Sequence, residues 1–344
     1  KTGHFTEEWT STRNFTTSDT LDLFFDPALL SRAEIEQLLP EQKVVFDKAG
    51  LPSASMSDRI KIKRMNQWFN SFGPDIPFFA SVYLLASHYP FDPPGGDFVP
   101  PFEPYYLGDK SRYISFLGYP KKYSQIMWNR YKNSLRFVDD CLRDLFSELK
   151  KTGKLEDTIV IITGDHGTLF HEHGLVNHAG YLYNEVIKVP LIISGASDTY
   201  PIDDGNSPVG HVDLGPTILE MLGLPLHPNH QGVPILYRDA PTTSLFNRPL
   251  YSTVQLVVQE DCVILWPWKY CYNRREQQDR LFDLSVDPAE SDNQAKSNQS
   301  TAKTLFELLD SFRNRQLTYY SPDESYRNEF YPPQVTTVQR EGLR

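Results

Sequence analysis

The chain has 344 residues, of which 40% are hydrophobic and 23% are charged, so its composition is that of a globular protein and excludes a disordered chain. Its formal net charge is −10, from 34 Lys and Arg residues against 44 Asp and Glu residues. Nucleic-acid binding depends on neutralising phosphates with Lys and Arg, so we expect no nucleic-acid partner. An anionic substrate would need a local source of positive charge, such as a metal ion or a His or Lys cluster.

The sequence up to about residue 86 predicts helices followed by one buried strand. Residues 31–72 are typical of helices, and Ser31 with Glu34 forms a capping-box pattern at their start. The apolar run at residues 78–85 predicts a strand buried on both faces, as in a parallel sheet. The longest apolar stretch, residues 78–86, is far shorter than the ~20 residues of a membrane-spanning helix. We therefore expect membrane contact only through a segment that this sequence does not include.

The middle of the chain predicts helix–strand alternation. Residues 89–125 are rich in Pro and Tyr, and we expect them to form a long loop that shapes a pocket. A helix is predicted from about residue 125 to Lys151, with Gly153 as its stop. Strands are predicted at residues 158–162 and 189–193, and a helix at 214–222 with Asp213 as N-cap. This alternation favours an α/β layer fold.

The character of the sequence changes near residue 241. Short strands are predicted at residues 250–258, 262–272 and 280–284, and a final helix at 301–316. We therefore predict a core at residues 1–240 and a small C-terminal subdomain with a tail at 241–344. The three cysteines, Cys141, Cys262 and Cys271, form no CxxC pair, and their odd number argues against a disulfide framework.

The segment Gly164-Asp165-His166-Gly167 directly follows the predicted strand at 158–162. The carboxyl end of a strand in an α/β sheet is where such folds bind ligands, and neighbouring carboxylate and imidazole groups suit one divalent ion. Four histidines lie within 13 residues, at positions 166, 171, 173 and 178. The alternative is that these are surface or capping side chains of a loop. The strand and the His cluster favour a site.

These motifs and several others, in order along the chain, resemble the sulfatase family of the alkaline-phosphatase superfamily. The further motifs are Ser87-His88-Tyr89-Pro90-Phe91, His171-Glu172-His173-Gly174, Asn177-His178-Ala179-Gly180, His211-Val212-Asp213-Leu214-Gly215-Pro216-Thr217 and Leu281-Phe282-Asp283-Leu284. The resemblance implies an alkaline-phosphatase-like α/β fold, with a mostly parallel sheet sandwiched by helices and a small C-terminal α+β subdomain.

The resemblance also implies roles for individual residues. Asp165 and His166 would bind one divalent metal ion, whether Ca, Mn, Zn or Mg. His88 and His178 would be catalytic, contacting the transferred sulfate or phosphate group or its leaving oxygen. His171 and His173 are weaker candidates for substrate binding, and a structural role is favoured for His211.

The family's nucleophile motif, Cys/Ser-x-Pro-x-Arg, and its early acidic strand are not found in this sequence. The sequence opens with Thr2-Gly3-His4-Phe5-Thr6, which resembles the family strand that follows the nucleophile helix. Three explanations stay open: the chain is a fragment that lacks an N-terminal half, another polypeptide completes the site, or the nucleophile is Thr16 or Thr17.

Two functions follow from the resemblance. The first is a metal-dependent hydrolase or transferase of sulfate or phosphate esters. The second is a non-catalytic sulfatase-fold domain of an envelope membrane protein that binds lipid or protein partners. Similarity to membrane-anchored bacterial members, including lipoteichoic-acid-synthase-like proteins, favours an extracytoplasmic location, whether periplasmic, secreted or membrane-anchored.

Overall fold

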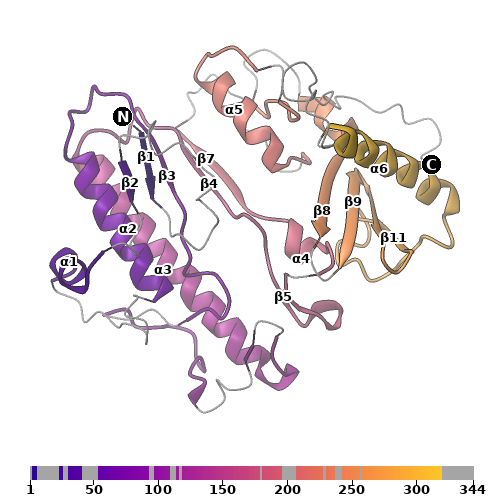
Figure 1. Cartoon of the computed structure of the whole chain (residues 1–344), viewed down its shortest axis with the longest axis horizontal. Helices are drawn as coiled ribbons and strands as arrows, with labels where there is room; N and C mark the ends of the chain where they lie inside the picture. The colour runs from indigo at the N-terminus through magenta and orange to yellow at the C-terminus, as the bar shows by residue number, and fades with distance from the viewer. Residues whose placement is uncertain are drawn as a thin grey trace. The chain divides into compact units, whose positions relative to one another are not determined.

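In the computed structural model the chain forms two compact units, whose helices and strands are drawn in Figure 1. The described residues are 2–5, 23–25, 30–40, 53–92, 97–108, 114–115, 118–178, 180–195, 207–227, 230–236, 242–255 and 258–319. The first unit is Lys1–Thr158 with Phe170–Asn177, and the second is Ile159–Leu169 with His178–Arg344. The boundary predicted at residue 240 falls inside the second unit and stays a prediction. Among the described helices, none is long and apolar enough to cross a membrane.

The first unit is built on a parallel sheet of β1 (Thr2–Phe5), β2 (Leu23–Phe25) and β3 (Phe79–Val82), in the order β2-β1-β3. This confirms the parallel pairing predicted for the apolar run at 78–85. The prediction of burial on both faces is wrong at the start of the strand, where Phe79 is 59% exposed. In the described part of the chain β3 is an edge strand, so its side chains lack neighbours on one side.

Three helices complete the first unit: α1 (Arg32–Leu38), α2 (Ala54–Phe69) and α3 (Ser124–Lys151). The predicted capping box starts α1, because the Ser31 backbone N–H donates to the Glu34 carboxylate at 2.8 Å and the Glu34 N–H donates to the Ser31 hydroxyl at 3.3 Å. The predicted stop of α3 is also confirmed, since Gly153 follows it with a left-handed φ of 69°.

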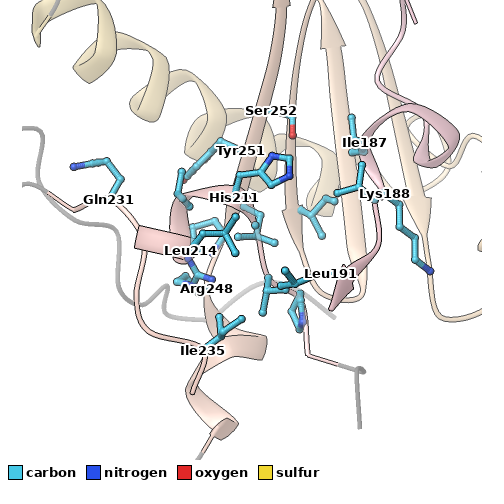
Figure 2. Close-up of a pocket in the computed structure, with 18 of the residues that line it drawn as sticks. Ile187, Lys188, Leu191, His211, Leu214, Gln231, Ile235, Arg248, Tyr251 and Ser252 are labelled. Carbon is cyan, nitrogen blue, oxygen red and sulfur yellow. The ribbon is translucent and has the colours of Figure 1, made fainter. Parts of the chain in front are cut away.

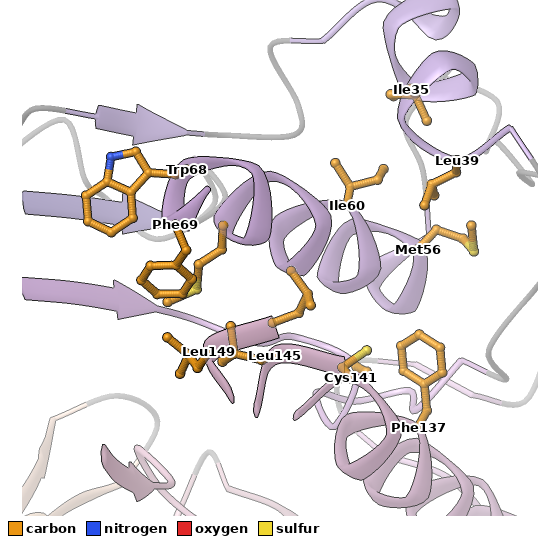
Figure 3. Packing of buried hydrophobic residues seen from close by; sticks show 13 residues of the cluster. Ile35, Leu39, Met56, Ile60, Trp68, Phe69, Phe137, Cys141, Leu145 and Leu149 are labelled. Carbon is orange, nitrogen blue, oxygen red and sulfur yellow. The ribbon is translucent and has the colours of Figure 1, made fainter. Parts of the chain in front are cut away.

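The core of the first unit lies between α1, α2 and α3 (Figure 3). Helix α2 contributes Met56, Ile60 and Phe69, and α3 contributes Phe137 and Leu145. Every one of these side chains is less than a tenth exposed. Their periodic spacing explains why the helical pattern was visible in the sequence.

The second unit begins with β4 (Val160–Thr163), which pairs antiparallel with β7 (Leu191–Ser194). We expected a strand buried among parallel neighbours. Instead, β4 is half-buried and its described partner runs in the opposite direction. Two short strands, β5 (Leu169–Phe170) and β6 (Val176–Asn177), pair in the chain that follows β4, and all of their residues except Leu169 belong to the first unit.

Two short helices, α4 (Asn184–Ile187) and α5 (Leu214–Met221), follow in the second unit. Asp213 occupies the predicted N-cap position of α5, but its side chain makes no capping hydrogen bond to that helix. Its carboxylate instead accepts from the Gly210 and Val233 backbone N–H groups and pairs with both terminal nitrogens of Arg248, at 2.8 and 2.6 Å. Asp213 therefore ties α5 to the segment before β8.

The C-terminal part is an antiparallel sheet of β8 (Leu250–Gln255), β9 (Gln259–Leu265), β10 (Trp268–Asn273) and β11 (Gln278–Asp283). Helix α6 (Gln299–Tyr319) packs on one face through Leu305 and Leu309 (Figure 1). The single strand predicted at 262–272 is wrong, because Trp266 and Pro267 form a turn there that splits it into the hairpin β9–β10. When a buried hairpin has no Asn-Gly turn, its sequence resembles that of one continuous apolar strand.

Candidate functional site

The loop after β4 carries the two predicted metal ligands. The His166 Nδ1 lies 2.9 Å from the Gly167 carbonyl oxygen, so this nitrogen must carry a proton and donate it. The other ring nitrogen, Nε2, lies 3.6 Å from Oδ2 of Asp165 and is the ring atom left to bind a cation. The other carboxylate oxygen, Oδ1, accepts from the His166 backbone N–H at 2.8 Å. Both side chains are exposed.

This geometry fits a divalent cation. Two electron-pair donors that face each other at 3.6 Å repel unless a proton or a cation lies between them. Carboxylate oxygen and imidazole nitrogen are ligands that zinc and manganese accept, and hard cations accept the oxygen. No group of three or more His, Cys, Asp or Glu side chains suited to a metal occurs among the residues that the structure describes. Asp165 and His166 would therefore be only part of a ligand set, and their role as metal ligands stays a prediction.

His178 lies next to this pair in the second unit. Its ring packs on the ring of His166, with centroids 4.0 Å apart and planes inclined by 33°. Eleven residues lie between the two histidines in the chain, and the second unit brings the two rings together. The structure therefore assembles Asp165, His166 and His178, three of the predicted site residues, in one place.

Gly167 locks the loop against α4. Its N–H donates to the Val186 carbonyl at 2.6 Å. A Cβ atom at this position would lie 2.1 Å from the Glu185 carbonyl oxygen, so a larger residue could not approach this closely. The glycine after His166 is therefore required by the close contact of two backbone segments.

The segment between His178 and α4 is held by buried carboxylates of the C-terminal part, which the sequence did not indicate. The Leu182 N–H donates to Glu260 at 2.7 Å, and Nη2 of Arg280 donates to both Glu260 oxygens at 2.7 Å each. The Asn184 N–H donates to Glu290 at 2.5 Å, and Lys269 pairs with the same carboxylate at 2.6 Å. Charged hydrogen bonds inside the protein thus anchor the chain that carries His178.

His211 holds the other side of the loop. Its Nε2 lies 2.8 Å from the Gly164 carbonyl oxygen and 3.5 Å from the Thr163 hydroxyl. Because the carbonyl only accepts, Nε2 donates to the residue directly before Asp165. This contact agrees with the structural role favoured for His211.

His88 belongs to the first unit, in the turn after β3, and its Nδ1 donates to the Tyr89 carbonyl at 2.7 Å. The chain before it is held by Asp58, whose carboxylate accepts from the Leu85 and Ala86 N–H groups at 2.7–2.9 Å. Lys61 pairs with Asp58 at 3.0 Å, and both side chains are fully buried. Burial raises the pKa of Asp58, and Lys61 and the two backbone donors oppose that effect.

His171 and His173 also lie in the first unit. The His171 Nε2 is 3.1 Å from the Tyr119 carbonyl oxygen, and its ring meets the edge of the Tyr119 ring. Both histidines have left-handed backbones, with φ of 81° and 53°. Substrate binding by these two residues stays a prediction. Thr16 and Thr17 lie outside the described residues.

A separate cavity of about 1830 Å³ opens within the second unit (Figure 2). Leu191, Leu214 and Ile235 line it, together with His211 and Arg248. Among the described residues, its lining does not include Asp165, His166 or His178. Its volume exceeds the ~300–1,000 Å³ of usual small-molecule pockets. The candidate site is therefore the loop after β4, and not this cavity.

Comparisons with known proteins agree with this arrangement. The Sulfatase family model matches residues 1–224. The multifunctional alkaline phosphatase superfamily protein PehA of Trinickia caryophylli is 39% identical over 89 residues, 25% of this chain and 17% of that protein. The N-acetylglucosamine-6-O-sulfatase of Bacteroides thetaiotaomicron is 27% identical over 220 residues, 59% of this chain and 38% of that protein. The chain thus spans well under half the length of these two relatives.

A solved structure shows the same fold. The phosphonate monoester hydrolase of Agrobacterium radiobacter superposes with a TM-score of 0.65 at 17% identity, over 94% of this chain and 81% of that one. This likeness and the predicted motif order support the alkaline-phosphatase-like α/β fold. Since the family model covers more than half of the sequence, the chain belongs to the sulfatase family of the alkaline-phosphatase superfamily.

Proposed function

We propose that this chain is part of a metal-dependent hydrolase of sulfate or phosphate esters, in which Asp165 and His166 bind one divalent ion. The observation that carries the proposal is the 3.6 Å approach of Asp165 Oδ2 to His166 Nε2, with the His178 ring packed on the His166 ring. Family membership supports the same reaction class. Calcium, manganese, zinc and magnesium all remain candidates for the ion.

A bound divalent ion would withdraw charge from the ester oxygens and from the attacking group. The remaining work falls to side chains of this protein. His178 donates a hydrogen bond to the transferred group, from a ring oriented by its packing on His166. His88 protonates the leaving oxygen or binds a second ester oxygen, because its Nδ1 is fixed by the Tyr89 carbonyl and its ring is exposed.

The nucleophile is part of the proposal as well. The Cys/Ser-x-Pro-x-Arg segment is not found in these 344 residues. We propose that the nucleophile and the remaining metal ligands come from polypeptide that this sequence does not include, with Thr16 or Thr17 as the alternative. We also place the reaction outside the cytoplasm, on the similarity to membrane-anchored family members.

The test is hydrolysis by the whole protein as it occurs in its source. Its intact mass shows whether further polypeptide is present, and aryl sulfates, phosphate monoesters and phosphonate monoesters are offered as substrates. We expect turnover of at least one class, its loss in Asp165→Asn, and little change in Asp157→Asn, an exposed acid before β4. Turnover that survives Asp165→Asn would contradict the metal assignment. Cation binding without any turnover would favour a non-catalytic sulfatase-fold domain.

A further inference from the structure

Two of the three cysteines, both of them free thiols in the structure, lie opposite each other on neighbouring strands of the C-terminal sheet. In the antiparallel ladder between β9 and β10, Cys262 lies directly opposite Cys271. The two side chains therefore point to the same face of the sheet. That face packs against Leu182, and the Cys271 sulfur lies 4.0 Å from the Leu182 carbonyl oxygen. Nine residues apart in the chain, the two thiols become neighbours through the hairpin.

The type of cross-strand pair can be worked out from the hydrogen bonds. The Arg274 N–H donates to the Gln259 carbonyl at 2.8 Å, so these two opposite residues form a hydrogen-bonded pair. Hydrogen-bonded and non-hydrogen-bonded pairs alternate along an antiparallel ladder. Cys262 and Cys271 lie three positions further along, so they form a non-hydrogen-bonded pair. Such pairs have a Cα–Cα separation of about 4.5 Å, inside the ~4.4–6.8 Å range of disulfides.

The surroundings of the pair argue against a role of either thiol as a nucleophile or as a metal ligand. Both side chains are 1% exposed. Burial raises the pKa of Cys262 above its ordinary value, and the neighbouring Cys271 thiol adds to the effect. A protonated, buried thiol is a poor nucleophile and a poor metal ligand. We therefore expect the two thiols to be oxidised during folding, before this face of the sheet is buried.

We propose that Cys262 and Cys271 form an intramolecular cross-strand disulfide when the chain folds in an oxidising compartment. The two thiols lose two protons and two electrons, and one S–S bond forms. The oxidant is a disulfide, either of a thiol oxidoreductase or of a small molecule such as oxidised glutathione, and it is reduced to two thiols. The bond closes the β9–β10 hairpin, which also carries the anchoring residues Glu260 and Lys269.

Cys141 is a matched internal control. It is equally buried, on α3 in the first unit, and burial raises its pKa to about 12. It lies outside the β9–β10 ladder and has no cysteine opposite it. If burial alone decided which cysteines are oxidised, all three would be oxidised to the same extent.

The full chain is exported to the oxidising bacterial periplasm and, in parallel, produced in the reducing cytoplasm. Soluble protein from each is denatured and alkylated, then digested with trypsin, which cleaves between the two cysteines after Lys269. We expect three alkylated cysteines in the cytoplasmic protein and only Cys141 in the periplasmic protein. The latter should be lighter by two hydrogen atoms before alkylation, with Cys262 and Cys271 in one linked peptide.

A Cys141→Ala variant should keep the linked peptide, and a Cys271→Ala variant should lose it and gain an alkylated Cys262. Periplasmic protein with all three cysteines alkylated would overturn the proposal. A linked peptide that contains Cys141 would overturn it as well.

Discussion

Both units of the chain bury charged side chains that hold backbone near a predicted site histidine, but they do so over very different distances in sequence. In the first unit, Asp58 pairs with Lys61 on α2 and binds the Leu85 and Ala86 backbone, which is 27 and 28 residues away in sequence. In the second unit, Glu260 and Glu290 bind Leu182 and Asn184, which are 78 and 106 residues away in sequence.

This difference shows which parts of the molecule hold the backbone near each histidine in place. The support of His88 is part of the helical core of its own unit, so it forms whenever α2 packs. The support of the His178 segment comes from the C-terminal part, which the sequence predicted to be a small subdomain apart from the core. The C-terminal sheet is therefore a component of the candidate site, and each of the predictions below changes one of these supports or its surroundings.

The largest effect is expected for Asp58→Asn. The change removes the negative charge from the ion pair with the fully buried Lys61 ammonium, and breaking a buried ion pair in this way costs about 3–5 kcal/mol. The measurement is the free energy of unfolding in urea, with the exposed acid Asp75→Asn as control. A loss no larger than that of the control would show that the pair does not hold the β3 turn.

A smaller effect is expected for Glu260→Gln, because its partner Arg280 is 15% exposed and can regain some hydration. Loss of charged hydrogen bonds to Arg280 and to the Leu182 N–H should cost about 1.5–3 kcal/mol. Chemical denaturation measures this cost. Hydrogen exchange of the Leu182 amide should also become faster, whereas Glu307→Gln on the exposed side of α6 should leave both unchanged. Unaltered exchange at Leu182 would argue against the anchor.

Gly167→Ala tests the contact between the loop after β4 and α4. The added methyl group would overlap the Glu185 carbonyl, and such overpacking costs about 1–3 kcal/mol. Cation affinity should fall at the same time, because the loop that carries Asp165 and His166 must shift. Gly73→Ala, where a methyl group meets nothing within 4 Å, is the matched control. Wild-type affinity in Gly167→Ala would mean that the loop tolerates the shift.

The smallest effect is expected for Ser31→Ala, which removes the capping hydroxyl of α1. Loss of an N-cap side chain costs about 1 kcal/mol. Thermal unfolding measures it against Glu34→Gln, which preserves a capping-box residue. Equal unfolding midpoints for wild type and Ser31→Ala would indicate that α1 is held by Ile35 and Leu39 in the core alone.

Features of this protein that depend on neighbouring residues could be predicted from the sequence. The capping box at Ser31, the glycine stop at Gly153 and the Asp165-His166 loop after a strand are all local patterns. The β9–β10 hairpin was missed, because Trp266 and Pro267 carry none of the usual turn signals. Glu260 and Glu290 bind the Leu182 and Asn184 backbone only once segments distant in sequence have packed together. The spacing of residues in a single sequence cannot predict such contacts.

The most direct test of the account is divalent-cation binding by the whole protein. Equilibrium dialysis after chelation, with calcium, manganese, zinc and magnesium in turn, measures affinity and stoichiometry for wild type, Asp165→Asn, His166→Ala and the Asp157→Asn control. The account predicts one bound ion in wild type and in the control, and a large loss of affinity in both ligand variants. Unchanged binding in Asp165→Asn and His166→Ala would contradict the central claim that these two side chains hold the metal.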